Sequence, residues 1–75
     1  MCLGIPMRIV EIMPPFRALV ETKGVRRDVS IALVAEEDLK VGDWLMIHVG
    51  SAIAKLDEDS ARDTLEILEE VSRLQ

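Results

Sequence analysis

The 75-residue sequence predicts an all-β fold, a small antiparallel barrel of five short strands followed by one C-terminal α-helix. Short segments rich in Ile, Val and Leu come first, separated by Gly, Pro and acidic residues. No helical pattern lies between them, which argues against the crossover helices of a parallel sheet. A single domain is expected over residues 1–75, with the barrel in 1–56 and the helix in 57–75.

The first strand is expected over residues 4–12, where Arg8 and Glu11 are the polar positions. Their spacing of three breaks strict alternation, which indicates a bulge or a strong bend in this strand. Pro14-Pro15 then ends the strand and forces a turn, because proline cannot donate a ladder hydrogen bond.

The second and third strands are expected to form a hairpin around Lys23-Gly24. The second strand covers residues 16–22, and the third alternates strictly from residue 25 to residue 33. One face of the third strand is expected to carry Val25, Arg27, Val29, Ile31 and Leu33. The acidic residues 36–38 mark a solvated loop after it.

The fourth strand is expected over residues 44–49, and the fifth over residues 52–56. Alternate side chains of a strand share a face. The core-facing set of the fourth strand is Leu45, Ile47 and Val49. The outward-facing set is Trp44, Met46 and His48. Five short strands of this kind fit a small OB-like barrel.

The acidic run at residues 57–60 is expected to begin the helix, because acids stabilise the positive end of the helix dipole. A calcium loop is a poorer interpretation, since the EF-hand spacing and glycine are missing. The helix is expected to end near Leu74 and to present a broad apolar stripe. The stripe consists of Ala61, Leu65, Leu68, Ile67, Val71 and Leu74.

Composition limits the function classes. The net charge is −5, and residues 35–75 hold eleven acidic and four basic side chains, which disfavours nucleic acid as a partner. No apolar run is long enough for a membrane span, and no signal peptide is evident. A single cysteine cannot form an internal disulfide, so a reducing compartment, the cytoplasm, is expected.

Cys2 is the residue with the most distinctive chemistry. Because cysteine is small, removal of Met1 is expected, which would leave a thiol beside a free α-amine. A neighbouring ammonium favours the thiolate, the form that binds metals and acts as a nucleophile. The amine nitrogen could complete a chelate ring with the sulfur. The alternative interpretation is a buried structural cysteine.

His48 is the only histidine. It is either a ligand or proton acceptor at the Cys2 site, or an exposed histidine without a function. A thiolate with an imidazole suits iron, copper or zinc rather than magnesium. One cysteine and one histidine cannot fill a tetrahedral zinc site, so a metal held here would be shared or transient.

Three segments resemble one protein family. MCLGIP at residues 1–6 resembles the N-terminal signature of the HypC/HybG/HupF family of nickel–iron hydrogenase maturation chaperones. GDWLMIHVG at residues 42–50 is similar to the second conserved block of that family, and AIAKLD at residues 52–57 is similar to its C-terminal end. Together the three segments extend the resemblance over the whole chain.

The resemblance implies an OB-type barrel with a C-terminal helix, and it implies a metal carrier. Cys2 matches the essential cysteine of the family, which becomes the N-terminal residue and binds iron, and His48 matches its strand histidine. The implied cargo is a transient iron with cyanide and carbon monoxide ligands, without a permanently bound cofactor. The implied partners are HypD, an iron–sulfur protein, and the precursor of the hydrogenase large subunit.

Apolar residues beside Cys2 are expected to be exposed and to contact both partners in turn. The predicted partner-binding set is Cys2, Leu3, Ile5, Pro6, Met7 and Met46.

Three other functions compete with the carrier. An adaptor would bind the large-subunit precursor without carrying metal. An enzyme with a Cys2 nucleophile would need a base, an oxyanion hole and a substrate pocket, and only His48 could be that base. A nucleic-acid module would need more stacking aromatics than Phe16 and Trp44. The protein is therefore expected not to be an enzyme.

Overall fold

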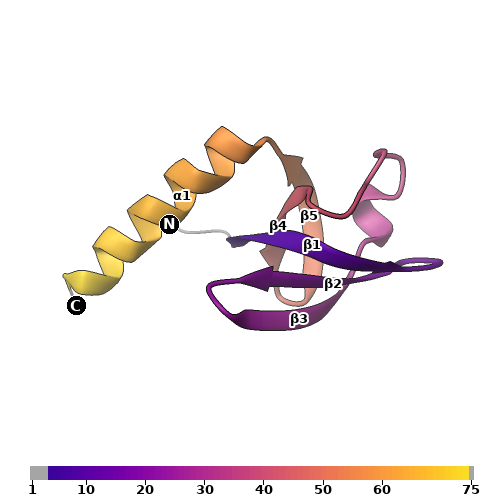
Figure 1. Cartoon of the computed structure of the whole chain (residues 1–75), viewed down its shortest axis with the longest axis horizontal. Coiled ribbons are helices and arrows are strands. Elements are labelled where there is room, and N and C mark those ends of the chain that lie inside the picture. Colours follow the sequence, from indigo (N-terminus) through magenta and orange to yellow (C-terminus); the bar gives the residue numbers. More distant parts are fainter. Residues whose placement is uncertain (1–3, 75) are drawn as a thin grey trace.

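The computed structural model describes residues 4–74, and within them the strands precede a single α-helix (Figure 1). The elements are β1 (Ile5–Met13), β2 (Arg17–Thr22), β3 (Val25–Ser30), the short 3-10 helix η1 (Ala32–Val34), β4 (Trp44–His48), β5 (Ser51–Leu56) and α1 (Glu58–Arg73). The strands close into a barrel in the order β1-β2-β3-β5-β4. Only the β3–β5 pairing is parallel among these strands. The predicted all-β OB-like barrel with a C-terminal helix is confirmed. The expectation that all pairings are antiparallel is wrong, because β3 and β5 run in the same direction where they close the barrel.

Strand β1 has the irregularity that its polar positions predict. Its pairing with β2 shifts register between Ile9 and Glu11, which is a β-bulge. A bulged strand bends, and β1 pairs with β2 through one part of its length and with β4 through another. The bend therefore lets β1 close the barrel.

The two tight hairpins both use left-handed backbone. Lys23 and Gly24 have φ angles of 49° and 81°, as a two-residue turn between twisted strands requires. Val49 and Gly50 have φ angles of 50° and 76° between β4 and β5. The prediction that Val49 faces the core is wrong, because the turn takes it out of the strand and leaves its side chain 88% exposed.

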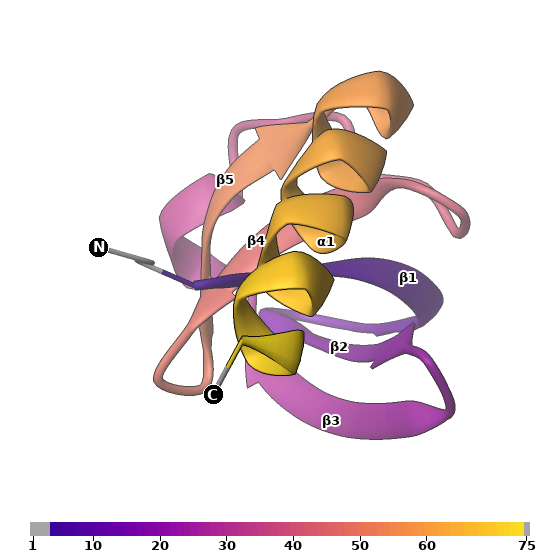
Figure 2. The same ribbon diagram turned by 90° about the vertical axis from the view of Figure 1, so that its left-hand side faces the viewer.

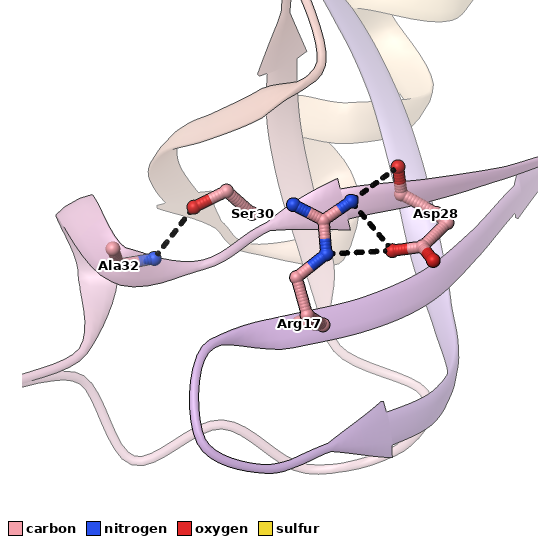
Figure 3. Close-up of polar contacts among 4 residues, drawn as sticks. All are labelled: Arg17, Asp28, Ser30 and Ala32. Carbon is pink, nitrogen blue, oxygen red and sulfur yellow. Dashed lines mark hydrogen bonds and ion pairs between the residues drawn. The ribbon is translucent and has the colours of Figure 1, made fainter.

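Hydrogen bonds of polar side chains link β2 to β3 and hold the chain where β3 ends (Figure 3). The Arg17 Nε donates to Asp28 Oδ1 at 2.8 Å, and its Nη2 donates to the Asp28 carbonyl oxygen at 3.2 Å. The Ser30 hydroxyl oxygen accepts a hydrogen bond from the Ala32 amide at 3.3 Å, where the chain leaves the sheet. The predicted extension of this strand to Leu33 is wrong, since Leu33 lies in η1 and is exposed.

The core lies inside the barrel and draws on every strand. Its buried members are Met7, Ile9, Ala18, Val20, Val29, Ile31, Val34, Leu45, Ile47 and Ala52. Partly buried Ile12 and Leu39 pack against them.

Helix α1 begins as its sequence predicts and packs along β1 and β4 (Figure 2). The Asp57 carboxylate caps it, because Asp57 Oδ1 accepts a hydrogen bond from the Ser60 amide at 2.8 Å. The backbone and hydroxyl hydrogen bonds from Ser60 lower the pKa of Asp57 below its ordinary value of 3.8. No helix among residues 4–74 is long and apolar enough to cross a membrane.

Only one row of the predicted helical stripe packs on the barrel. Ala61 is fully buried, and Leu65 and Leu68 are half-buried. In the other row, Ile67 is 63% exposed and Leu74 is 82% exposed. The helix therefore contacts the barrel along a narrower face than the stripe.

Candidate functional site

The candidate site lies where the chain enters the barrel. Cys2 and Leu3, two of the predicted site residues, lie outside the described residues. Gly4 is the first residue described, and its Cα lies close against β4. A Cβ at this position would stand 2.4 Å from the Ile47 carbonyl oxygen and 3.1 Å from the Met46 Sδ. A side chain here would therefore push the start of the chain away from β4.

The strand register brings His48 to the same place. Ile5 pairs with Ile47, and Pro6 pairs with Met46, in the antiparallel β1–β4 ladder. Continuing this register by one residue sets Gly4 opposite His48. His48 is exposed at the end of β4, which confirms the predicted outward orientation, while Ile47 before it is buried.

The predicted partner-binding residues divide by burial. Ile5 is 48% exposed and Met46 is half-buried, so both can offer surface. The expected exposure of Met7 is wrong, because Met7 is 4% exposed and pairs with buried Leu45 inside the barrel. Pro6 is fully buried as well, so neither Pro6 nor Met7 offers its side chain to a partner in this fold.

Alternation could have revealed the burial of Met7. Met7 is two residues before buried Ile9 on β1, so the two side chains share the inward face. Ile5 belongs to the same face but is the first residue of β1, and it is 48% exposed. The role of Gly4 could be suspected from a glycine at a strand start, which often marks a close backbone approach.

An apolar groove begins beside this end of the barrel. It has a volume of about 370 Å³ and runs between α1 and the β2–β3 hairpin. Its apolar lining comes from Ile5, Val25, Leu65 and Leu68. Lys23 of the hairpin forms an ion pair with Glu69 of α1 across it.

That ion pair is also the main electrostatic feature here. The hydrogen bond and the charge of Lys23 lower the pKa of Glu69 below its ordinary value of 4.5. The carboxylate is exposed, so the pair chiefly positions α1 over the hairpin and adds little free energy.

The described residues alone do not make a metal site. Within residues 4–74, no three side chains of His, Cys, Asp or Glu gather closely enough to hold a metal ion. The donor that this end of the barrel presents is the imidazole of His48. A metal bound there would need further donors from residues outside the described range, from its own ligands or from a partner.

The fold defines the class of protein as a small OB-like barrel with a C-terminal helix. The chain belongs to the HupF/HypC family, whose sequence model matches residues 1–68. The resemblance of the three sequence segments to this family is thereby confirmed.

Relatives from several bacteria support the assignment. The chain is 42% identical over 71 residues to the hydrogenase maturation factor HypC of Helicobacter hepaticus, covering 95% of this chain and 81% of that protein. It is 44% identical over 75 residues to HypC of Cupriavidus necator, covering 100% and 81%. It is 40% identical over 76 residues to the hydrogenase maturation factor HybG of Escherichia coli, covering 95% and 92%.

Proposed function

We propose that the protein is a hydrogenase maturation chaperone that carries an iron with cyanide and carbon monoxide ligands through Cys2. It assembles this group with a HypD-type iron–sulfur protein and delivers it to the precursor of a nickel–iron hydrogenase large subunit. Membership of the HupF/HypC family is the observation that carries the proposal. The relatives' names, hydrogenase maturation factors HypC and HybG, support the same process.

The anchoring of Gly4 supports a joint role for Cys2 and His48. Cys2 precedes Gly4 by two residues, so covalent geometry keeps the two Cα atoms within about 7 Å. Gly4 is held against β4 opposite His48. A thiolate and an imidazole from these two residues would suit iron as a cargo.

An incomplete donor set is what a carrier of this cargo needs. Cyanide and carbon monoxide already occupy part of the coordination sphere of the iron. One or two protein donors then suffice to hold the group, and a closed cage of four would oppose its release. The thiolate of Cys2 can exchange with thiolates of the receiving protein. Ile5 follows Cys2 by three residues in the chain, and its exposed surface favours contact with that protein.

An infrared spectrum tests the proposal. The protein is purified without oxygen together with its HypD-type partner, and the bands of iron-bound cyanide and carbon monoxide are recorded. The wild-type complex is expected to show these bands, and Cys2→Ala is expected to lose them while still folding. His48→Ala tests whether the imidazole alters the band positions.

A hydrogenase assay separates the carrier from the adaptor. A carrier requires the Cys2 thiol, so Cys2→Ala should abolish maturation of the large subunit. An adaptor that only binds the precursor would support maturation after the same change. Retained maturation with Cys2→Ala would therefore reject the carrier and leave the adaptor.

A further inference from the structure

Strand β3 lies at the margin of the barrel and has one edge without a strand partner over most of its length. Its first edge pairs with β2 from Val25 to Ser30. Its second edge pairs with β5 at Ser30 alone, within the described residues. Figures 1 and 2 show no described helix or strand beyond most of β3 on this side. Residues 25–28 are exposed, so a second chain can reach this edge.

The register of the β2–β3 hairpin decides which backbone groups point to this edge. Residues that flank a two-residue turn form a hydrogen-bonded pair, and such pairs alternate with pairs whose backbone groups point apart. Thr22 and Val25 flank the turn, so the N–H and C=O groups of Arg26 and Asp28 point away from β2. The Ser30 amide continues this series, and it donates at 3.0 Å to the carbonyl oxygen of the residue before β5.

Arginine side chains already occupy the two carbonyl oxygens that point to this edge. The Arg27 Nη1 donates to the Arg26 carbonyl oxygen at 3.0 Å. The Arg17 Nη2 donates to the Asp28 carbonyl oxygen at 3.2 Å (Figure 3). Arg17 also pairs with the Asp28 carboxylate, whereas Arg27 forms no ion pair within residues 4–74. An uncompensated positive charge therefore lies at the middle of the edge.

Without these arginines the edge would fit a second copy of itself. Antiparallel pairing about a two-fold axis at residue 27 would place Arg26 opposite Asp28 of the second copy, which is a favourable pairing of opposite charges. The free backbone groups of both residues would then bond across the axis. The same symmetry places Arg27 opposite Arg27 of the second copy, in a pair that is not hydrogen-bonded and whose side chains are closest. Like charges in that position oppose pairing.

We propose that Arg27 keeps the β3 edge from pairing with a second copy of the chain. Its guanidinium occupies a carbonyl acceptor of the edge, and its charge would face an identical charge across the two-fold axis. Charged side chains on an edge strand are a general means of preventing association between edges. This role concerns the isolated chain and does not depend on the proposed function.

Sedimentation of the full chain at concentrations up to about 1 mM tests this role. Wild type should remain monomeric. Arg27→Thr removes the charge and the hydrogen bond, and the variant should fold because position 27 is exposed and threonine suits a strand. Its dimer association constant should exceed the wild-type value by about tenfold or more. An Arg27→Thr variant that stays as monomeric as wild type would overturn the proposal.

Two further variants separate the position of Arg27 from the loss of any arginine. Arg8→Thr is the matched control, because Arg8 is exposed on β1 and that strand is paired on both edges at this position. Both threonine variants change the net charge equally, and Arg8→Thr should stay monomeric. Arg27→Lys keeps the positive charge and should stay monomeric as well. Association of either variant as tight as that of Arg27→Thr would contradict the role of the Arg27 charge.

Amide hydrogen exchange locates the pairing. In wild type the amides of Arg26 and Asp28 should exchange faster than the Arg27 amide, which bonds to Val20 inside the hairpin. In Arg27→Thr the amides of residues 26 and 28 should become protected at high concentration and lose this protection on dilution. A dimer that protects only α1, or that leaves residues 26 and 28 unprotected, would show that the β3 edge is not the surface involved.

Discussion

The barrel and the helix of this protein are stabilised in different ways. The barrel encloses a core to which every strand contributes, whereas Ala61 is the only fully buried residue of α1. The outer row of α1 remains exposed, and the ion pair between Lys23 and Glu69 links the helix to the β2–β3 hairpin. Burial of apolar surface is the main source of folding free energy. The barrel core therefore contributes most of the folding free energy, and only a few contacts hold the helix against the barrel.

The largest expected effect comes from the barrel core. Leu45→Ala should lower the free energy of unfolding by about 2–5 kcal/mol, because Leu45 is fully buried and the substitution leaves a cavity. Leu74→Ala at the end of α1 should change it by less than about 0.5 kcal/mol, since Leu74 is 82% exposed. Urea denaturation measures both. Similar decreases in the free energy of unfolding for the two variants would contradict the conclusion that the barrel is more stably packed than the helix.

The second prediction concerns the start of β1. Gly4→Ala should destabilise the protein by about 1–3 kcal/mol, because the added Cβ meets the rigid Ile47 carbonyl oxygen at 2.4 Å. The amide signals of Ile47 and His48 should shift, and under the proposed function, maturation should fall. Ile5→Ala is the neighbouring control for the unfolding midpoint and the β4 amide signals only, since Ile5 is half exposed and its truncation creates no clash. An unchanged unfolding midpoint and unshifted β4 amides for Gly4→Ala would show that the chain start is not held against β4.

The third prediction concerns the β4–β5 hairpin. Val49→Gly should raise the free energy of unfolding by up to about 1 kcal/mol, because a β-branched residue at a φ of 50° is strained and glycine is not. The side chain of Val49 is 88% exposed, so little burial is lost. Thermal denaturation measures the gain. Val25→Gly, in an extended strand, should be destabilising and serves as the control.

The smallest expected effect concerns the attachment of the helix. Glu69→Gln should lower the unfolding midpoint slightly at pH 7, because it removes the carboxylate that pairs with Lys23. The pKa of Glu69 is lowered in the folded protein, so this stabilisation is present above the ordinary value of 4.5 and is lost as the pH falls through the folded pKa.

Thermal denaturation of wild type and variant across this range measures the effect. The two midpoints should differ at pH 7 and converge under more acidic conditions. Glu66→Gln is the control, because Glu66 is exposed and forms no ion pair within residues 4–74. A difference for Glu69→Gln that persists in acid would mean that the carboxylate charge is not its source.

The sequence by itself determined the local features of this protein. The polar spacing in β1 predicts the bulge, Lys23-Gly24 predicts the hairpin turn, and Asp57 predicts the start of α1. Alternation along β4 correctly predicts the outward orientation of His48. Each of these features follows from the conformational preferences of a few neighbouring residues, and those residues can be read from the sequence.

Only the tertiary structure decided how these features meet. Closure of the barrel buries Met7, and it ends β3 at Ser30 although the alternation continues to Leu33. The close approach of Gly4 to Ile47 depends on the pairing of segments more than forty positions apart. Such contacts depend on register and on barrel closure, and no local pattern encodes them. The sequence therefore identifies Cys2 and His48 as candidate site residues, while the fold decides which surfaces are available to partners.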